Sequence, residues 1–190
     1  MKNYKNTMQK SVLALFVLIS ASLFVGCSDD DDPPTPVNEE EVITTMNVTL
    51  TAAGATTVTL QSQDLDGDGP NAPTISVSGD LTANTTYAGT IELLNETESP
   101  AEDITEEVKS EDDEHQFIFV SGGTISGITY SDEDGDGNPV GIEFDLTTGD
   151  AGSGSLQITL RHEPKKPNDG TLADAGGETD ITQTFNLTVQ

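Results

Sequence analysis

The chain has 190 residues, among them 34 Asp and Glu but only seven Lys and Arg, so its formal net charge at pH 7 is −27. The negative electrostatic field of such a chain repels nucleic acid and anionic lipid headgroups, which excludes nucleic acid as a partner and favours the binding of cations. Cys27 is the only cysteine, which excludes a disulfide framework.

The first 26 residues have the pattern of a secretory leader. Three lysines precede an apolar run from Val12 to Val25. The run is shorter than the roughly 20 residues that a membrane-spanning helix needs, and it ends in Gly26. The stretch LFVGC resembles a lipobox, although the position that is usually Leu holds Phe24. We therefore expect cleavage before Cys27 and acyl chains on it that hold the protein on a membrane; the alternative is a secreted protein with a free thiol.

Residues 27–41 predict an acidic, disordered tether. In SDDDDPPTPVNEEE, four Asp and three Glu surround three prolines, and such a segment cannot bury apolar surface. An acidic run directly after the cysteine resembles the export signal of Bacteroidetes lipoproteins. That resemblance implies an outer-membrane lipoprotein that faces the cell exterior, and the alternative is a spacer on a lipoprotein that faces the periplasm. Without the three leader lysines, 34 acids stand against four bases, a charge of −30.

Residues 42–190 have the length of one domain and alternate apolar with polar residues in about nine stretches. This period of two, rich in Thr, Val and Ile and interrupted by Gly, Asn and Asp, predicts an all-β fold, an Ig-like antiparallel β-sandwich. The apolar positions are Met46, Val48 and Leu50; Val58 and Leu60; Ile75 and Val77; Tyr87, Ile91 and Leu93; Phe117 and Phe119; Ile128 and Tyr130; Ile142, Phe144 and Leu146; Leu156, Ile158 and Leu160; and Ile181, Phe185, Leu187 and Val189.

One segment, SPAEDITEEVKSEDDEH, breaks the alternation. Ser99 is placed as an N-cap, Pro100 as the first helical residue and Glu102 as the closing member of a capping box. A narrow apolar stripe follows, formed by Ala101, Ile104, Val108 and His115. The segment predicts an amphipathic helix of three to four turns that covers an edge of the sandwich.

The stretch DEDGDGNPVGIE fits the calcium-loop pattern at each specified position. The ligands would be Asp132, Asp134, Asp136, the Asn138 carbonyl and Glu143, with Gly137 at the turn. Both flanks, however, look like strands, so Glu143 should lie on the order of 10 Å along a strand and point to solvent. We therefore reject an EF-hand and keep two alternatives, a calcium site at a hairpin tip and an ordinary Asp- and Gly-rich turn.

A second, weaker loop of this kind is DLDGDGPN, with Asp64, Asp66 and Asp68. Ile75 stands where the closing Glu would be. The same two alternatives, calcium or a turn, apply to this loop.

Few other residues suggest chemistry. His115 and His162 could bind zinc with nearby carboxylates, but they are 47 residues apart, and we interpret both as exposed or edge-packed. The chain has no nucleophile elbow, P-loop or dinucleotide-binding turn and no Trp for sugar stacking, so we expect no enzyme and no cofactor other than calcium.

Taken whole, the chain resembles a group of uncharacterised flavobacterial lipoproteins over nearly its full length. The likeness rests on CSDDDD, NEEEVITT, LNETESPAEDITEEV, EHQF, LRHEP and AGGETDITQTF. Such proteins are often labelled as type 1 periplasmic binding fold proteins, but that fold has two α/β lobes over nearly 300 residues. The sequence instead predicts a lipid-anchored binding or interaction module for an unknown protein or small molecule, or else a periplasm-facing solute-binding accessory.

Overall fold

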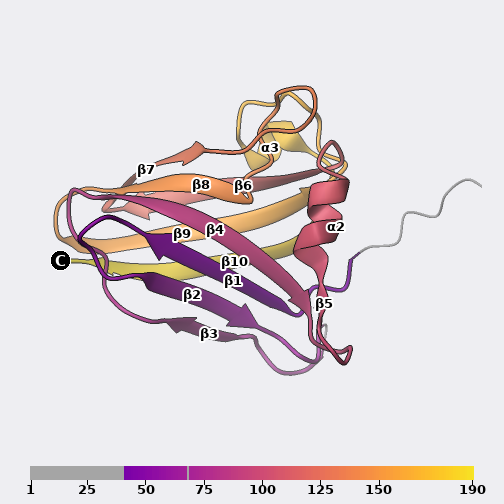
Figure 1. The fold of residues 1–190 in the computed structure, drawn as a ribbon, viewed down its shortest axis with the longest axis horizontal. Coiled ribbons are helices and arrows are strands. Elements are labelled where there is room, and N and C mark those ends of the chain that lie inside the picture. The colour runs from indigo at the N-terminus through magenta and orange to yellow at the C-terminus, as the bar shows by residue number, and fades with distance from the viewer. Residues whose placement is uncertain (1–40, 68) are drawn as a thin grey trace, which may run out of the picture. The chain divides into compact units, whose positions relative to one another are not determined.

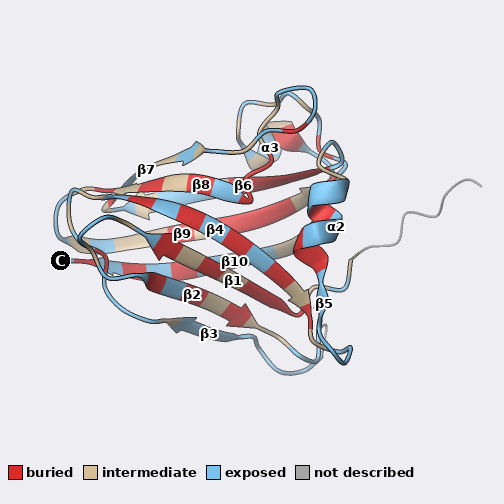
Figure 2. Cartoon of the chain, viewed as in Figure 1, coloured by how far each residue is buried: buried red, intermediate tan, exposed pale blue. Residues whose placement is uncertain are grey.

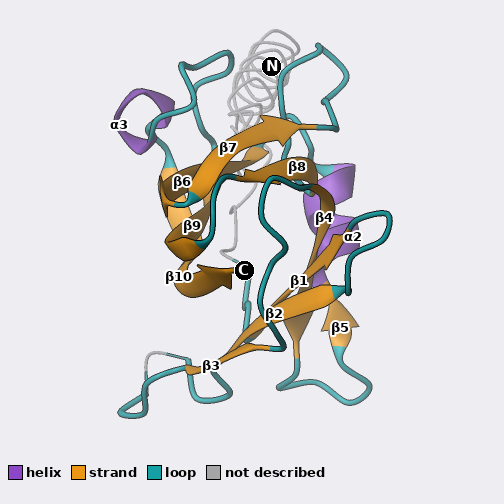
Figure 3. Cartoon of the chain, turned by 90° about the vertical axis from the view of Figure 1, so that its left-hand side faces the viewer, coloured by secondary structure: helices purple, strands orange, loops and turns teal. Residues whose placement is uncertain are grey.

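Two antiparallel sheets pack face to face in the computed structural model of the chain, which describes residues 41–67 and 69–190 (Figure 1). The larger sheet has the strand order β3-β2-β1-β4-β8-β7, with β5 paired to β4, and the smaller has the order β10-β9-β6. The elements are β1 (Thr45–Thr51), β2 (Val58–Gln63), β3 (Thr74–Val77), β4 (Thr86–Asn95), β5 (Glu102–Asp103), α2 (Ile104–Ser110), β6 (His115–Gly123), β7 (Ile125–Tyr130), β8 (Glu143–Thr148), β9 (Gly152–His162), α3 (Leu172–Ala175) and β10 (Glu178–Val189). The predicted all-β sandwich is confirmed, and Figure 3 shows β6, β9 and β10 on one side of it and β1, β2 and β4 on the other.

The core lies between the sheets and follows from the alternation in the sequence. In β4, buried and exposed residues alternate from Tyr87 to Leu93, which gives the striped ribbon in Figure 2. Met46, Val48 and Leu50 of β1 are fully buried in the same way. Each such side chain contributes about 1.5–3 kcal/mol by leaving water.

Gly89 of β4 allows one close approach inside the core. Its strand partner in β8 is Phe144, whose ring lies directly over the glycine. A Cβ atom at position 89 would be 2.5 Å from the Phe144 Cζ atom, a distance that packed atoms do not tolerate. The glycine therefore makes room for one of the largest buried side chains.

The predicted long helix is wrong in length and in its start. Helix α2 has seven residues, and its N-cap is Asp103, whose side chain accepts a hydrogen bond from the Thr105 amide. Glu102 belongs to β5, so it closes no capping box, and His115 begins β6 instead of ending a helical stripe. The expected apolar contacts survive in Ile104 and Val108, which are buried, as is Thr105, which donates to the Leu93 carbonyl and accepts from the Leu93 amide.

The segment 163–178 contains the short helix α3, capped by Thr171. Among residues 41–67 and 69–190, no helix is long and apolar enough to cross a membrane.

Candidate functional site

The two histidines of the chain are neighbours in the smaller sheet. Strand β6 begins at His115 and β9 ends at His162, and the antiparallel register places these two residues opposite each other. Their side chains therefore leave the same face of the sheet, with ring centroids 4.6 Å apart and planes inclined by 30°.

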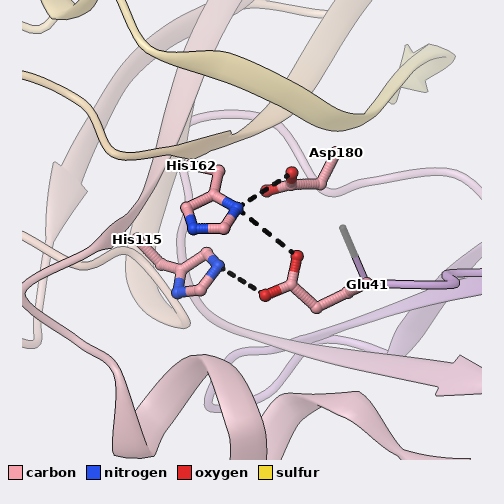
Figure 4. Close-up of side chains that lie close together, drawn as sticks. All are labelled: Glu41, His115, His162 and Asp180. Atoms are coloured by element: carbon pink, nitrogen blue, oxygen red, sulfur yellow. Dashed lines mark ion pairs between the residues drawn. The ribbon is translucent and has the colours of Figure 1, made fainter. Parts of the chain in front are cut away.

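Two carboxylates complete a cluster with the histidines. Asp180 lies in β10 at a register shift between Thr179 and Ile181, where the strand has one residue more than its partner β9. Such a bulge redirects a side chain out of the ordinary alternation. Glu41 comes from the segment that leads into β1, and Figure 4 shows all four side chains pointing toward one another. We call Glu41, His115, His162 and Asp180 the His–carboxylate cluster.

The cluster is held together at short range. The His115 Nε2 atom lies 2.9 Å from Glu41 Oε1, and the His162 Nδ1 atom lies 3.8 Å from both Glu41 Oε2 and Asp180 Oδ1. Each of the four residues offers one ligand atom, and these atoms all lie within 4.8 Å of one another. This spacing is close to that of a four-coordinate metal site.

Burial separates this cluster from the many surface carboxylates of the chain. The exposed fraction of the side chain is 0% for His115, 3% for Glu41, 5% for His162 and 1% for Asp180. Glu41 Oε2 and His115 Nε2 are buried without a hydrogen bond of acceptable geometry among the described residues. Buried polar atoms normally form a hydrogen bond, so two neighbouring buried polar atoms that lack one are unusual.

The outer nitrogens of both histidines face oxygen atoms. His115 Nδ1 lies 3.1 Å from the Glu111 carbonyl, which can only accept, so Nδ1 carries the hydrogen. His162 Nε2 lies 4.0 Å from Glu114 Oε2. In both rings the nitrogen on the opposite side faces the cluster, which is the orientation that metal-binding histidines have.

Further acids surround the cluster. Glu107 in α2 is exposed, but partial desolvation of its carboxyl raises its pKa, and repulsion by Glu41 and then by Glu111 adds to this rise. Glu163 lies with Glu114 beside His162 in a second acidic group. The electrostatic field at the cluster is therefore negative and favours a cation.

The structure thus corrects the interpretation of the histidines as exposed, although His115 does lie in β6, an edge strand of the smaller sheet. Both are buried, at 0% and 4% exposure of the whole residue, and the ladder joins them although 47 residues separate them in sequence. A signal was present in the sequence, because His115 is in phase with Phe117 and Phe119, and His162 with Leu160 and Ile158. Both histidines therefore continue the inward alternation of their strands.

A polar cleft adjoins the cluster. It has a volume of about 480 Å³ and lies between the β1–β2 side of the larger sheet and the start of β10. Its lining includes Glu41, Ser62, Asp64, Asp180, Thr182 and Gln183. Ser62 Oγ and Gln183 Oε1 form a hydrogen bond of 3.2 Å between the two sheets.

The predicted calcium loop is a compact turn built around two aspartates. Asp132 accepts hydrogen bonds from the amides of Gly141 (2.6 Å) and Glu143 (3.0 Å). Asp134 is buried and accepts from the amides of Asp136 and Asn138, at 3.0 and 2.8 Å.

The other predicted ligands of this loop do not gather around Asp134. Asp136 is exposed, and Glu143 is exposed at the start of β8, as the strand pattern predicted. Gly137 has a φ of 82°, the left-handed conformation that favours glycine at the turn. Calcium binding here stays a prediction.

Of the second loop, the structure describes Asp64 and Asp66, whereas Asp68 lies outside the described residues. Asp66 Oδ2 accepts from the Asn71 side chain at 2.7 Å, and this hydrogen bond lowers the pKa of Asp66. Cys27, the predicted lipidation site, also lies outside the described residues.

No family model, no curated protein sequence and no solved structure matches the chain.

Proposed function

We propose that the protein is a lipid-anchored, exterior-facing β-sandwich that binds a ligand without catalysis. The observation that carries the proposal is the order of the sequence signals: an apolar leader, then Gly26 and Cys27, then the acidic run, and then a single β-sandwich. Acyl chains on Cys27 would supply the membrane contact, and the tether would hold the sandwich away from the bilayer.

The polar cleft beside β10 is the binding surface that we propose. Its volume of about 480 Å³ lies within the range of small-molecule sites, roughly 300–1,000 Å³. Carboxylate, hydroxyl and amide groups converge on it from both sheets, so it favours a ligand rich in hydroxyl groups, amides or amines. A peptide segment or a small polar molecule has this chemistry.

The same cleft favours a second candidate, a periplasm-facing lipoprotein that binds a solute. The two candidates share the anchor and differ in the side of the outer membrane on which the sandwich lies. Membership in the flavobacterial lipoprotein group remains part of the proposal. Of the two alternatives for the loop with Asp132, Asp134 and Asp136, we propose the ordinary turn over the calcium site, because Lys166 is already paired with Asp134.

Protease treatment of intact cells that make the protein separates the two candidates. The proposal expects that protease removes the sandwich from intact cells and that a periplasmic marker survives. A Cys27→Ser variant should leave the membrane fraction, which tests the anchor independently. If the sandwich survives until the outer membrane is opened, exterior display is wrong and the periplasmic candidate replaces it.

A further inference from the structure

We infer that Glu41, His115, His162 and Asp180 bind one divalent transition-metal ion of the zinc class. This inference goes beyond the proposed binding function and holds on either side of the membrane.

The donor atoms select the metal. Two imidazole nitrogens and two carboxylate oxygens suit zinc and its transition-metal neighbours, whereas calcium and magnesium prefer an all-oxygen shell. A tetrahedral zinc ion with bonds of about 2.0–2.2 Å holds its ligand atoms roughly 3.3–3.6 Å apart. Three pairs of these atoms lie 2.9, 3.8 and 3.8 Å apart, and all four atoms lie within 4.8 Å of one another. Rotation of the side chains by small amounts is therefore enough to close the site.

The contact between His115 and Glu41 is the second observation that points to a cation. The Glu111 carbonyl requires the hydrogen on His115 Nδ1, so a neutral ring presents the lone pair of Nε2 to Glu41 Oε1 at 2.9 Å. Two electron pairs at that distance repel unless a proton or a metal ion lies between them. His115 Nε2 is buried without a hydrogen bond, and so is Glu41 Oε2. A metal ion accounts for both atoms.

The surroundings of the rings are those of a metal site. With Nε2 of His115 and Nδ1 of His162 toward the ion, the opposite nitrogens face the Glu111 carbonyl and the Glu114 carboxylate. The hydrogen bond to the Glu111 carbonyl fixes the His115 ring, and the negative charge of Glu114, 4.0 Å from His162 Nε2, raises the basicity of the His162 ring. Two carboxylates also neutralise the charge of a divalent ion.

The arrangement favours a structural role for the ion. Four protein ligands fill a tetrahedral shell and leave no position for substrate or water. The ion would join the segment before β1 to three strands of the smaller sheet, β6, β9 and β10. Glu41 and Asp180 also line the polar cleft, which gives the ion a route from solvent.

Zinc binding is tested on the full chain, purified in detergent and stripped with a chelator. We expect one zinc ion per chain by elemental analysis, a visible spectrum of tetrahedral cobalt after Co²⁺ addition, and a higher unfolding midpoint with zinc. Millimolar calcium should not displace the ion. Glu41→Gln should weaken zinc binding by more than about 100-fold, since removal of an outer partner alone costs about 10- to 100-fold.

Two further variants keep the test decisive if Glu41→Gln does not fold. Glu114→Gln alters a side chain that is 49% exposed, so it should fold and bind zinc about tenfold more weakly. Glu143→Gln changes an exposed carboxylate outside the cluster and should bind zinc as the parent does.

The inference is overturned if the parent chain holds less than one zinc ion after gel filtration, or if Glu114→Gln and Glu143→Gln bind zinc equally well. Either result would make the cluster a proton-bridged network of histidines and carboxylates.

Discussion

The Nζ atom of Lys166 lies 3.2 Å from the Oδ2 atom of Asp134, and the two side chains are only 7% and 1% exposed. Lys166 also donates to the Asp112 carbonyl, so it connects the segment after β9, the loop after α2 and the Asp-rich loop. A protein cation therefore occupies a position beside Asp134 that the sequence pattern had suggested for calcium.

Replacement of Asp134 by Asn should lower the free energy of unfolding by about 2–4 kcal/mol, because it leaves the Lys166 ammonium buried without its carboxylate. Urea unfolding measures the change. Asp136→Asn is the matched control two residues along the same loop, and its exposed side chain should change stability by less than about 0.5 kcal/mol. Equal effects of the two variants would contradict a special role for Asp134.

Stability should also depend on Asp134 at acid pH. Burial tends to raise the pKa of its carboxyl, but hydrogen bonds from Asn138, Lys166 and the Asp136 amide outweigh burial and lower the pKa to about 2 from an ordinary value of 3.8. The charged form therefore stabilises the fold above pH 4, and this contribution is lost as the pH falls from about 4 to 2. The free energy of unfolding of the parent should fall more steeply over this pH window than that of Asp134→Asn. Parallel pH profiles would show that another acid is responsible.

Calcium and magnesium at millimolar concentration and matched ionic strength should give the same unfolding midpoint. The Asp134 carboxylate is already paired with the Lys166 ammonium, and Glu143 points to solvent. Thermal unfolding after chelator treatment is the measurement. A calcium-selective rise that disappears in Asp134→Asn and Asp136→Asn together would instead establish the predicted calcium site.

Addition of one methyl group at Gly89 should destabilise the core by about 1–3 kcal/mol, because the new Cβ would meet the ring of Phe144 at 2.5 Å. Gly127 in β7 provides the comparison, since a Cβ there has no atom within 4 Å. Chemical unfolding should show a lower free energy of unfolding for Gly89→Ala than for Gly127→Ala. A Gly89→Ala variant as stable as the parent would mean that Phe144 has room to move.

Thr105 links α2 to β4 through hydrogen bonds with both backbone groups of Leu93, at 2.8 and 3.3 Å. Thr105→Val keeps the shape but leaves the buried Leu93 amide without its acceptor, so we expect a loss of about 1–3 kcal/mol. Thr90→Val on the exposed face of β4 is the control. Hydrogen exchange at the Leu93 amide should accelerate only in Thr105→Val.

The sandwich could be predicted because each strand of a two-sheet sandwich buries one face, so that apolar residues recur at every second position. Tyr87, Ile91 and Leu93 show this within one strand. Edge strands were harder: Ile75 fits the alternation, yet it is 40% exposed because β3 pairs with β2 alone. The predicted helix start at Ser99 is wrong because Glu102 and Asp103 pair with β4 as strand β5, which delays the helix until after Asp103.

The His–carboxylate cluster could not be predicted because register and a bulge create it. Its members are separated by 74, 47 and 18 residues along the chain. Alternation indicates that His115 and His162 point inward, but only the pairing of β6 with β9 brings them together. Asp180 joins them because of a register shift in β10, which the sequence pattern does not predict.

The position of Glu41 also has a mechanical consequence. A pull on the chain from its N-terminal side reaches Glu41 before it reaches β1, so the contact of Glu41 with His115 bears load first. Beyond it, β1 is an inner strand that pairs with both β2 and β4, and a pull along its axis strains both ladders at once in shear. A domain held by its N-terminal side in flowing liquid would thus resist extension first through the contacts of Glu41 in the His–carboxylate cluster and then through both ladders of β1.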